Sequence, residues 1–495
     1  MTQSGDPLEN AIAERANGII KTEWLYKMSI PSIENCKEEL TLFALKTSFF
    51  DTILANTIIY FHFISIFSRQ SSNFASEING TGIMNKVKID NIQQENVQSC
   101  AIAVIGLGYV GYPLFCSISH GYECWGMDID EKRIETLSMG VTMMEGSQNN
   151  IHLTSLWSDI SHCTMFIVTI PTPVDYHNRP DLSALKAVCY SLGSILKAGD
   201  IVVFESTVYT GTTEEICVPI LEESSRLRLN KDFSVAYSPE RINVGDSLHT
   251  LENTPKILAA SDSTTLDKVR NIYATFMKAP IVIAKNIKVA ETAKMYENVQ
   301  RDVLIALANQ FSDFCHEEGI DVHDVTQCAS SKWNFSNVNP GLVGGHCIGV
   351  DPYYLLNRAT SKGIKLPLVE TARRINEVKS ETVAHRILEI ARTISGSHNS
   401  PNILLLGFSY KPNTSDIRNT KVADVIKWLQ NKCNVDCFDP LVDIEQAYEC
   451  YGITLSTLEN IQSRQYELIV LMVPHDILAN MDFSSIRHID IKEIL

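Results

Sequence analysis

Five apolar residues, Ala101 to Ile105, lead directly into the sequence Gly-Leu-Gly-Tyr-Val-Gly. A continuous apolar run is typical of a buried parallel strand, and this glycine spacing is typical of the turn after it. The first glycine permits a tight turn, the second lets the backbone approach a pyrophosphate, and the third lets the next helix pack on the strand. The residues that we expect to cradle a dinucleotide are Gly106, Leu107, Gly108, Tyr109, Val110 and Gly111.

A second strand is predicted from Tyr122 to Met127, and it ends at Asp128, 17 residues after Gly111. A carboxylate here accepts hydrogen bonds from a ribose 2′-hydroxyl and repels a 2′-phosphate, so it favours NAD over NADP. Arg133 follows, where it can cover the adenine ribose. Later strands at 164–169 and 201–205 are followed by Thr172 and Thr207, at the edge where open α/β sheets bind ligands. A glycine turn in an unrelated α/β domain is the alternative.

Residues 287–318 have helical periodicity and contain neither proline nor glycine. A helix of that length spans roughly 48 Å at 1.5 Å per residue, which suits a connector between two domains. Lys294 and Asn298 are four residues apart and share a helix face, and Glu291 lies one turn earlier. Taken alone, these side chains also fit an ordinary solvated stripe.

The stretch at 340–354 packs four glycines and two prolines around Cys347 and Asp351. Glycines at this density let the backbone wrap a ligand closely. A cysteine in such a loop is a candidate nucleophile, and a turn with an inert cysteine is the alternative. Asp351 is placed to orient a water, a lysine or a substrate.

A further strand–helix alternation follows, with apolar strands predicted at 402–406, 434–438 and 467–473. It indicates a second doubly wound domain. Lys411 and Arg418 lie in the loop after the first of these strands, where they form either an anion site or solvated surface. The fold class expected is therefore α/β, with two Rossmann-like doubly wound domains joined by a long central helix.

The charge balance argues against a nucleic-acid partner, because 42 basic and 58 acidic residues leave a net charge of −16. The 13 cysteines show neither a CxxC pair nor Cys/His metal spacing. This usage favours a reduced cytoplasm and predicts no metal site.

The first hundred residues differ from the rest. Their apolar run at 53–67 has 15 residues, fewer than the ~20 that span a bilayer, so no membrane role is expected. Residues 5–24 resemble the end of the integrase core of insertion-sequence transposases, with Glu14 as the third carboxylate of a metal-binding triad whose two aspartates are absent. We interpret 1–100 as extraneous: a transposase-like remnant at 1–40, then translated linker, with Met84 as an original start. An ordinary N-terminal extension is the alternative, and no role is assigned to 41–83.

Seven motifs occur in one order and together resemble the UDP-glucose/GDP-mannose dehydrogenase family over nearly all of 101–495. Within the resemblance, KWNF, GGHCIGVDPYYL and ARRIN look like the bacterial branch that acts on UDP-N-acetylglucosamine or UDP-N-acetylgalactosamine for capsular or O-antigen polysaccharides. The seven motifs are GLGYVG at 106–111, TIPTPVD at 169–175, ESTVYTGTTEE at 205–215, SPERINVGD at 238–246, AETAKMYENVQRD at 290–302, GLVGGHCIGVDPYYL at 341–355 and SYKPNTSDIRNT at 409–420.

The resemblance implies a division of the chain and a reaction. An NAD-binding Rossmann domain would cover 101–286, a central helical dimerisation and catalytic region 287–385, and a UDP-binding Rossmann-like domain 386–495. The last domain is expected to be truncated at its C-terminus, because the family continues with a further strand and helix. The family oxidises the sugar C6 alcohol to a carboxylate with two NAD⁺, through a thiohemiacetal and a thioester on a cysteine. It also implies a homodimer.

Carried over onto this chain, the family's roles fall on three groups of residues. The catalytic group is Cys347 as nucleophile, Lys294 and Asn298 at the C6 oxyanion, Asp351 supporting a water or the lysine, Glu240 as general base and Thr207 positioning water. Besides the glycine motif, Asp128, Arg133, Thr172 and Arg418 would bind NAD. Lys332, Gly345, Lys411 and Arg374 would bind the UDP-sugar, although either Arg373 or Arg374 could point inward.

Four other functions remain open on the sequence alone. They are a UDP-glucose 6-dehydrogenase, a two-electron β-hydroxyacid-type dehydrogenase that would not need Cys347, an inactive fusion or truncated pseudogene product, and a transposase-like DNA-binding protein. The net charge and the incomplete triad oppose the last.

Overall fold

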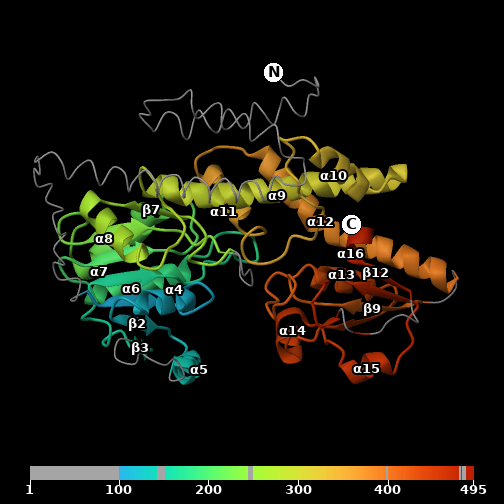
Figure 1. The fold of residues 1–495 in the computed structure, drawn as a ribbon, viewed down its shortest axis with the longest axis horizontal. Coiled ribbons are helices and arrows are strands. Elements are labelled where there is room, and N and C mark those ends of the chain that lie inside the picture. Colours follow the sequence, from blue (N-terminus) through green and yellow to red (C-terminus); the bar gives the residue numbers. More distant parts are fainter. Residues whose placement is uncertain (1–99, 142–150, 243–248, 397–399, 479–480, 482–486) are drawn as a thin grey trace, which may run out of the picture. The chain divides into compact units, whose positions relative to one another are not determined.

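The computed structural model describes residues 100–141, 151–242, 249–396, 400–478, 481 and 487–495. The expected transposase remnant with Glu14, the linker and Met84 all lie outside the described residues. Everything described belongs to the unit that runs from Asn96 to Leu495. It contains two separate sheets, with the long helix α9 (Ile287–Glu318) between them in the sequence (Figure 1).

The described strands of the first domain form one sheet in the order β3-β2-β1-β4-β5-β6-β7-β8. All neighbours are parallel except β6 and β7. The order of the first six is that of the dinucleotide-binding Rossmann sheet, whose topological switch point lies between β1 and β4. The strands are β1 (Ile102–Ile105), β2 (Cys124–Met127), β3 (Ile151–Thr154), β4 (Met165–Val168), β5 (Ile201–Phe204), β6 (Ser234–Tyr237), β7 (Lys256–Ala260) and β8 (Ile281–Ile283).

Two apolar cores cover the two faces of this sheet. Along β1 the side chains alternate between them: Ala103 and Ile105 belong to one core, and Ile102 and Val104 to the other. This double burial explains why the strand reads as an unbroken apolar run. Helices α6 (Ser183–Ile195), α7 (Val218–Ser225) and the start of α9 cover the first face, and α4 (Gly111–Ser119), α5 (Glu131–Val141) and α8 (Ser263–Tyr273) cover the second. A single π-helical turn, η4 (Thr213–Cys217), precedes α7.

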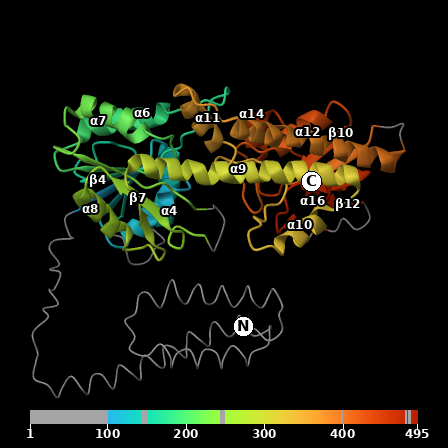
Figure 2. The same cartoon turned by 90° about the horizontal axis from the view of Figure 1, so that it is seen from above.

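Helix α9 confirms the predicted helix over 287–318, and local chemistry sets both of its ends. The Asn286 side chain accepts a hydrogen bond from the Val289 backbone N–H, and Gly319 closes the helix in the left-handed conformation at φ 68°. Helix α12 (Pro367–Ser395) lies alongside α9 in both views (Figures 1 and 2). The shorter helices α10 (Val322–Ser330) and α11 (Asp351–Ser361) come between them in the sequence.

The described strands of the second domain form a parallel sheet in the order β10-β9-β11-β12, so its topological switch point lies between β9 and β11. The predicted strands at 402–406 and 434–438 are confirmed. The end of α12, from Val383 to Ala391, packs into this domain's core, so the boundary expected at residue 386 falls inside one continuous helix. The elements are β9 (Asn402–Leu406), α13 (Val422–Leu429), β10 (Asn434–Phe438), α14 (Ile444–Tyr451), α15 (Leu458–Gln462), β11 (Leu468–Leu471), β12 (His488–Asp490) and α16 (Ile491–Ile494).

Strand β12 forms an edge of the second sheet. The expectation that the family's domain continues beyond this chain stays a prediction. Among the described residues, no helix is both long and apolar enough to cross a bilayer.

Candidate active site

The glycine loop after β1 has the geometry that a pyrophosphate needs. Gly106 adopts a φ of 93°, which favours glycine. A Cβ on Gly111 would lie 1.9 Å from the Gly106 carbonyl oxygen, so this third position packs helix against strand. A Cβ on Gly108 would meet nothing within 4 Å, so the second glycine leaves the backbone open on the side where a ligand approaches. The loop therefore fits a dinucleotide.

Asp128 and Arg133 both reach this loop. The Leu107 backbone N–H donates to Asp128 Oδ2 at 2.8 Å, and Arg133 Nε donates to the Leu107 carbonyl oxygen at 2.6 Å. The carboxylate thus stands at the end of β2 beside the glycine turn, where an adenosine ribose would lie. That these residues hold NAD stays a prediction.

Thr172 and Thr207 come together from the loops after β4 and β5. The Thr172 hydroxyl donates to the Thr207 carbonyl oxygen at 2.5 Å, and the Tyr354 hydroxyl of α11 donates to the Thr172 carbonyl oxygen at 2.6 Å. Tyr354 is fully buried, so α11 fixes this part of the ligand edge.

The cysteine loop meets the central helix at Asp351. Asn298 Nδ2 of α9 donates to Asp351 Oδ2 at 2.5 Å, and Asp351 is only 2% exposed. Burial raises the pKa of the Asp351 carboxyl to about 6, against the opposing effects of Lys294 and the Asn298 hydrogen bond. The Cys347 carbonyl oxygen accepts from the Asp351 backbone N–H at 2.9 Å, so Cys347 precedes the first turn of α11. The structure therefore assembles four predicted catalytic residues from two distant segments.

The Cys347 thiol is protonated in this arrangement. Burial raises its pKa to about 11, and the nearby Asp351 carboxylate acts in the same direction. Three cations, Lys294, Arg418 and Lys411, lower it. A thiolate is the reactive form, so attack by Cys347 requires proton loss during the step or a further cationic contribution.

Arg418 links the second domain to the glycine loop of the first. Its guanidinium carbon lies 5.1 Å from the Tyr109 ring centroid, and Asp416 holds it through a two-point ion pair in which Nε donates to Oδ1 at 2.9 Å. Gly345 lies against the second-domain loop that carries Arg418, because a Cβ on Gly345 would come within 2.8 Å of the Tyr410 ring in that loop. The contact explains why glycine occupies this position, with φ at 78°. The Cys347 loop is therefore fixed by the second domain as well.

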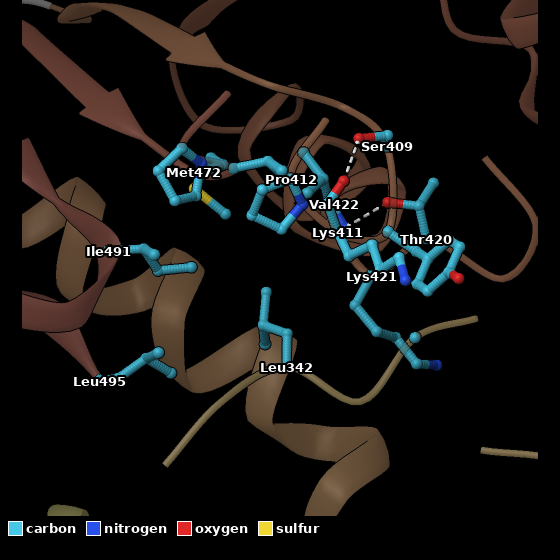
Figure 3. A pocket seen from close by; sticks show the side chains of 14 residues that line it. Leu342, Ser409, Lys411, Pro412, Thr420, Lys421, Val422, Met472, Ile491 and Leu495 are labelled. Atoms are coloured by element: carbon cyan, nitrogen blue, oxygen red, sulfur yellow. Dashed lines mark hydrogen bonds between the residues drawn. The ribbon is translucent and has the colours of Figure 1, made fainter. Parts of the chain in front are cut away.

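A pocket of about 150 Å³ lies at the switch point of the second sheet. Residues that follow β9, including Lys411, and residues that follow β11 form its ends. Thr420 and Lys421 lie beside it just before α13, which begins at Val422. In Figure 3 the apolar side chains of Leu342, Ile491 and Leu495 lie on one side, away from Ser409, Thr420 and Lys421. Lys411 and a helix N-terminus suit an anionic group.

Lys421 is buried and was missed in the sequence. It pairs with Glu377 of α12 and, at 3.2 Å, with Asp424 of its own helix. No local pattern marks it, because one of its two carboxylate partners, Glu377, lies 44 residues away. His346 was missed too: burial, together with the Arg418 charge, lowers its pKa to about 4, so the imidazole beside Cys347 is neutral.

Two predicted substrate-binding residues do not reach the pocket of the second domain. Lys332 and Arg374 are exposed and do not line the pocket. Of the two adjacent arginines, Arg373 points inward, and it pairs with Asp302 and Glu377 rather than with the pocket. Glu240 follows β6, at the carboxyl ends of the parallel strands of the first sheet, where it accepts from Lys256 at 3.3 Å. No group of metal-ligating side chains occurs among the described residues.

Models of three domains of one family match the chain in order. The NAD binding domain of the UDP-glucose/GDP-mannose dehydrogenase family matches 100–277, the central domain 288–378 and the UDP binding domain 404–494. The chain belongs to this family. It is therefore an NAD-dependent nucleotide-sugar dehydrogenase, as the sequence motifs predicted.

Individual relatives agree. The chain is 40% identical over 399 residues to a UDP-N-acetyl-D-glucosamine 6-dehydrogenase of Salmonella typhi, covering 79% of this chain and 93% of that protein. It is 41% identical over 396 residues to the protein of the same name from Pseudomonas aeruginosa, covering 78% and 93%. The solved structure of a UDP-D-ManNAc dehydrogenase from Pyrococcus horikoshii matches with a TM-score of 0.71 at 30% identity, covering 80% of this chain and 96% of that one. The predicted fold class is confirmed.

Proposed function

We propose that the chain oxidises the C6 alcohol of a UDP-N-acetylhexosamine to the uronic acid, a four-electron reaction that consumes two NAD⁺. The supporting observation is the position of Cys347. Its loop contacts the Lys294–Asn298 face of α9 through Asp351 and contacts the second domain through Gly345. An alcohol dehydrogenase that stops at the aldehyde needs no thiol here. Oxidation to the acid uses a thiol as the nucleophile that forms a covalent intermediate.

The residues divide the work as follows. The glycine loop, Gly106 to Gly111, would hold NAD, which when bound would supply the hydride acceptor for both oxidations of the sugar carbon. The Lys294 ammonium stabilises negative charge on the C6 oxygen, and Asn298 orients it. Cys347 forms a C–S bond with the aldehyde carbon, giving the thiohemiacetal and, after the second oxidation, the thioester. Glu240 then takes a proton from a water that Thr207 positions, and the sulfur leaves as the acid is released.

The substrate class follows from the second domain and the relatives. The pocket between β9 and β11 would take the diphosphate of the UDP group beside Lys411. Both relatives named above carry UDP-N-acetyl-D-glucosamine 6-dehydrogenase as their name. We therefore favour an N-acetylhexosamine over glucose, and we assign the product to capsular or O-antigen polysaccharide synthesis.

One assay tests the proposal. Purified protein is incubated with NAD⁺ and, separately, UDP-glucose, UDP-N-acetylglucosamine and UDP-N-acetylgalactosamine, and NADH and uronic acid are counted per sugar consumed. Two NADH and one acid from an N-acetylhexosamine support the proposal. One NADH per sugar supports the two-electron alternative, turnover of UDP-glucose alone supports the glucose enzyme, and no turnover supports an inactive product.

We propose a homodimer built on α9 and α10. Four large apolar side chains of α9 are at least 49% exposed, and α10 has no buried residue. Burying such a face is the usual reason for a permanent interface. The α9 residues are Tyr296, Leu307, Phe311 and Phe314. Light scattering on Phe311→Asp/Phe314→Asp should show a monomer where the unaltered chain is a dimer; a monomeric unaltered chain contradicts the interface.

We place the enzyme in the cytoplasm and propose that residues 1–100 take no part in catalysis. All cysteines among the described residues are free thiols, which suits a reducing compartment. Removal of residues 1–83, so that the chain begins at Met84, should leave the specific activity unchanged. Loss of folding in the shortened chain would contradict that division, and cell fractionation tests the location.

A further inference from the structure

Three charged side chains meet where β5 and β6 end and β7 begins in the first sheet. Lys256 Nζ donates to Glu205 Oε2 at 2.8 Å and to Glu240 Oε2 at 3.3 Å. The Tyr273 hydroxyl donates to the other Glu205 oxygen, and Lys256 Nζ lies 5.3 Å from the Tyr273 ring centroid. Lys256 is 3% exposed and Glu205 1% exposed, so this is an interior cluster.

The charges of the cluster do not cancel. Both oxygens of Glu205 have donors, so Glu205 and Lys256 already form a neutral pair. Glu240 is then a second carboxylate on one ammonium, which leaves one net negative charge near the protein interior. Burial alone would lower the pKa of Lys256, but the two carboxylates outweigh it and raise that pKa.

The two oxygens of Glu240 differ in their partners. Oε1 accepts from the backbone N–H groups of Arg241 at 2.6 Å and Ile242 at 2.8 Å. In the described part of the chain, the recorded partner of Oε2 is Lys256. Lys256 therefore influences both the direction and the charge of the Glu240 oxygen that is not committed to the backbone.

The cluster also ties together the loops that carry the proposed hydrolytic residues. Glu205 directly precedes Ser206 and Thr207, while Glu240 follows β6 and Lys256 begins β7. Arg241, next to Glu240, donates from Nε to Glu297 of α9 at 3.0 Å, one residue before Asn298. The cluster is thus joined along the chain to the Thr207 loop and, through Arg241, to α9 next to Asn298.

We propose that Lys256 is a positioning residue for the hydrolytic step, acting through Glu240. The inference rests on the function proposed above. In that step the water oxygen bonds to the thioester carbon, the C–S bond breaks with its electron pair going to the Cys347 sulfur, and the water proton goes to Glu240 Oε2. No electron is transferred to NAD, so Lys256 matters for hydrolysis and not for the two oxidations.

The test compares full-length Lys256→Met, which removes the charge, with Lys256→Arg, which keeps it. Each is mixed with NAD⁺ and the UDP-sugar that the unaltered enzyme uses, NADH is followed by stopped flow, and the quenched protein is weighed by mass spectrometry. Lys256→Met should release two NADH per site in a rapid burst and then turn over ~100-fold more slowly, with an acyl group on Cys347. Lys256→Arg should recover at least part of the slow phase.

A second variant keeps the test decisive if Lys256→Met does not fold. Glu205→Gln keeps the shape and the acceptor oxygen but leaves Lys256 facing Glu240 alone, so the acid limb of the hydrolysis rate should move to lower pH. In folded Lys256→Met the same limb should move to higher pH. General damage to the fold would not move the limb in opposite directions.

Three results would overturn the inference. They are an unchanged hydrolysis rate in folded Lys256→Met, a burst that is lost in parallel with steady-state turnover, and an acid limb in Glu205→Gln that stays in place or moves to higher pH. An unaltered enzyme that releases no uronic acid contradicts the proposed function and this inference together. An active unaltered enzyme beside a normally hydrolysing Lys256→Met contradicts only the role of Lys256.

Discussion

The two domains repeat one turn and use it differently. In each, a glycine after the first strand has φ near 90° and donates its N–H to the last residue of the neighbouring strand at 2.8 Å: Gly106 to Met127 and Gly407 to Phe438. In each, an aspartate directly after that neighbouring strand accepts from the residue after the glycine, Asp128 at 2.8 Å and Asp439 at 2.6 Å.

The surroundings of the two aspartates then diverge. Asp128 is partly exposed beside a glycine whose backbone is open. Asp439 is 5% exposed, accepts from Ser409 and Leu441 N–H groups, and pairs with the buried His475 at 3.0 Å. The same turn therefore leaves the carboxylate partly exposed in one domain and uses it to hold loops in the other. In the second domain we therefore expect recognition at the switch-point pocket rather than at Asp439.

The largest effect on activity is expected at Cys347, whose loop contacts both α9 and the second domain. Cys347→Ala should lower uronic acid formation by more than ~1,000-fold, because the covalent intermediate cannot form, while NAD and UDP still bind their own domains. Cys347→Ser should stall or slow at a covalent stage. Acid production and calorimetric titration with each nucleotide measure this.

The matched control is Cys450→Ala, an exposed thiol on α14. It should keep full activity. Normal uronic acid formation by Cys347→Ala would refute the covalent mechanism and leave the two domains as simple nucleotide-binding modules.

The second-largest effect, a loss of stability, is expected when Asp439 in the second domain loses its charge. Asp439→Asn should destabilise the protein by about 4 kcal/mol, because buried backbone donors and His475 lose their acceptor. Chemical denaturation should show this loss, and NAD affinity should be unchanged. If the variant were as stable as the parent but bound UDP-sugar poorly, Asp439 would be a ligand group and the contrast between the domains would fail.

Two buried aspartates should respond to pH with opposite signs. Asp351 has a raised pKa, about 6, so the folded state binds its proton more tightly than the unfolded state does. Its contribution to stability is therefore lost as pH rises from about 4 to about 6, a change of up to about 3 kcal/mol. Asp439 has a lowered pKa, because the hydrogen bonds from His475 and from backbone N–H groups outweigh burial. Its contribution to stability is lost as the pH falls below the usual pKa of an aspartate carboxyl.

Denaturation of Asp351→Asn across pH 4.5 to 8 checks this. The free energy of unfolding of the variant should fall less than that of the parent between pH 4.5 and pH 6.5. The exposed Asp267→Asn should track the parent. Identical pH profiles for Asp351→Asn and the parent would show that the junction carboxyl titrates normally.

The smallest effect is expected at the first domain's aspartate. Asp128→Asn should weaken NAD binding about tenfold, or about 1.4 kcal/mol, through weaker hydrogen bonds to the ribose, with stability changed by less than about 1 kcal/mol. Competition with NADP should also improve, because the repulsion of a 2′-phosphate is lost. A stability loss as large as that of Asp439→Asn would erase the distinction between the domains.

Much of the fold could be predicted from the sequence. The apolar runs at 402–406 and 434–438 are strands with those bounds, and the helix over 287–318 begins after Asn286 and ends at Gly319. These elements depend on local periodicity and caps, which the sequence displays directly. Strand β7 was not predicted, because a lysine opens it and its charge partners come from other strands.

The candidate site could be predicted from the sequence only in part. The glycine motif, Cys347 and Asp351 stand out because an unusual density of glycine marks them. The inward choice between Arg373 and Arg374 did not follow from spacing, because both lie on α12 and only packing against α9 decides which one Asp302 receives.

The sequence by itself determined the strand–turn–helix units, the length of the central helix and the residues able to do the chemistry, because each depends on neighbours within a few turns of chain. Tertiary structure alone decided which of those residues meet. Asn298 donates a hydrogen bond to Asp351, 53 residues away in the sequence, and Lys256 donates one to Glu205, 51 residues away. Hydrogen bonds and ion pairs at such separations depend on how the sheets and helices pack, and no local pattern records that packing.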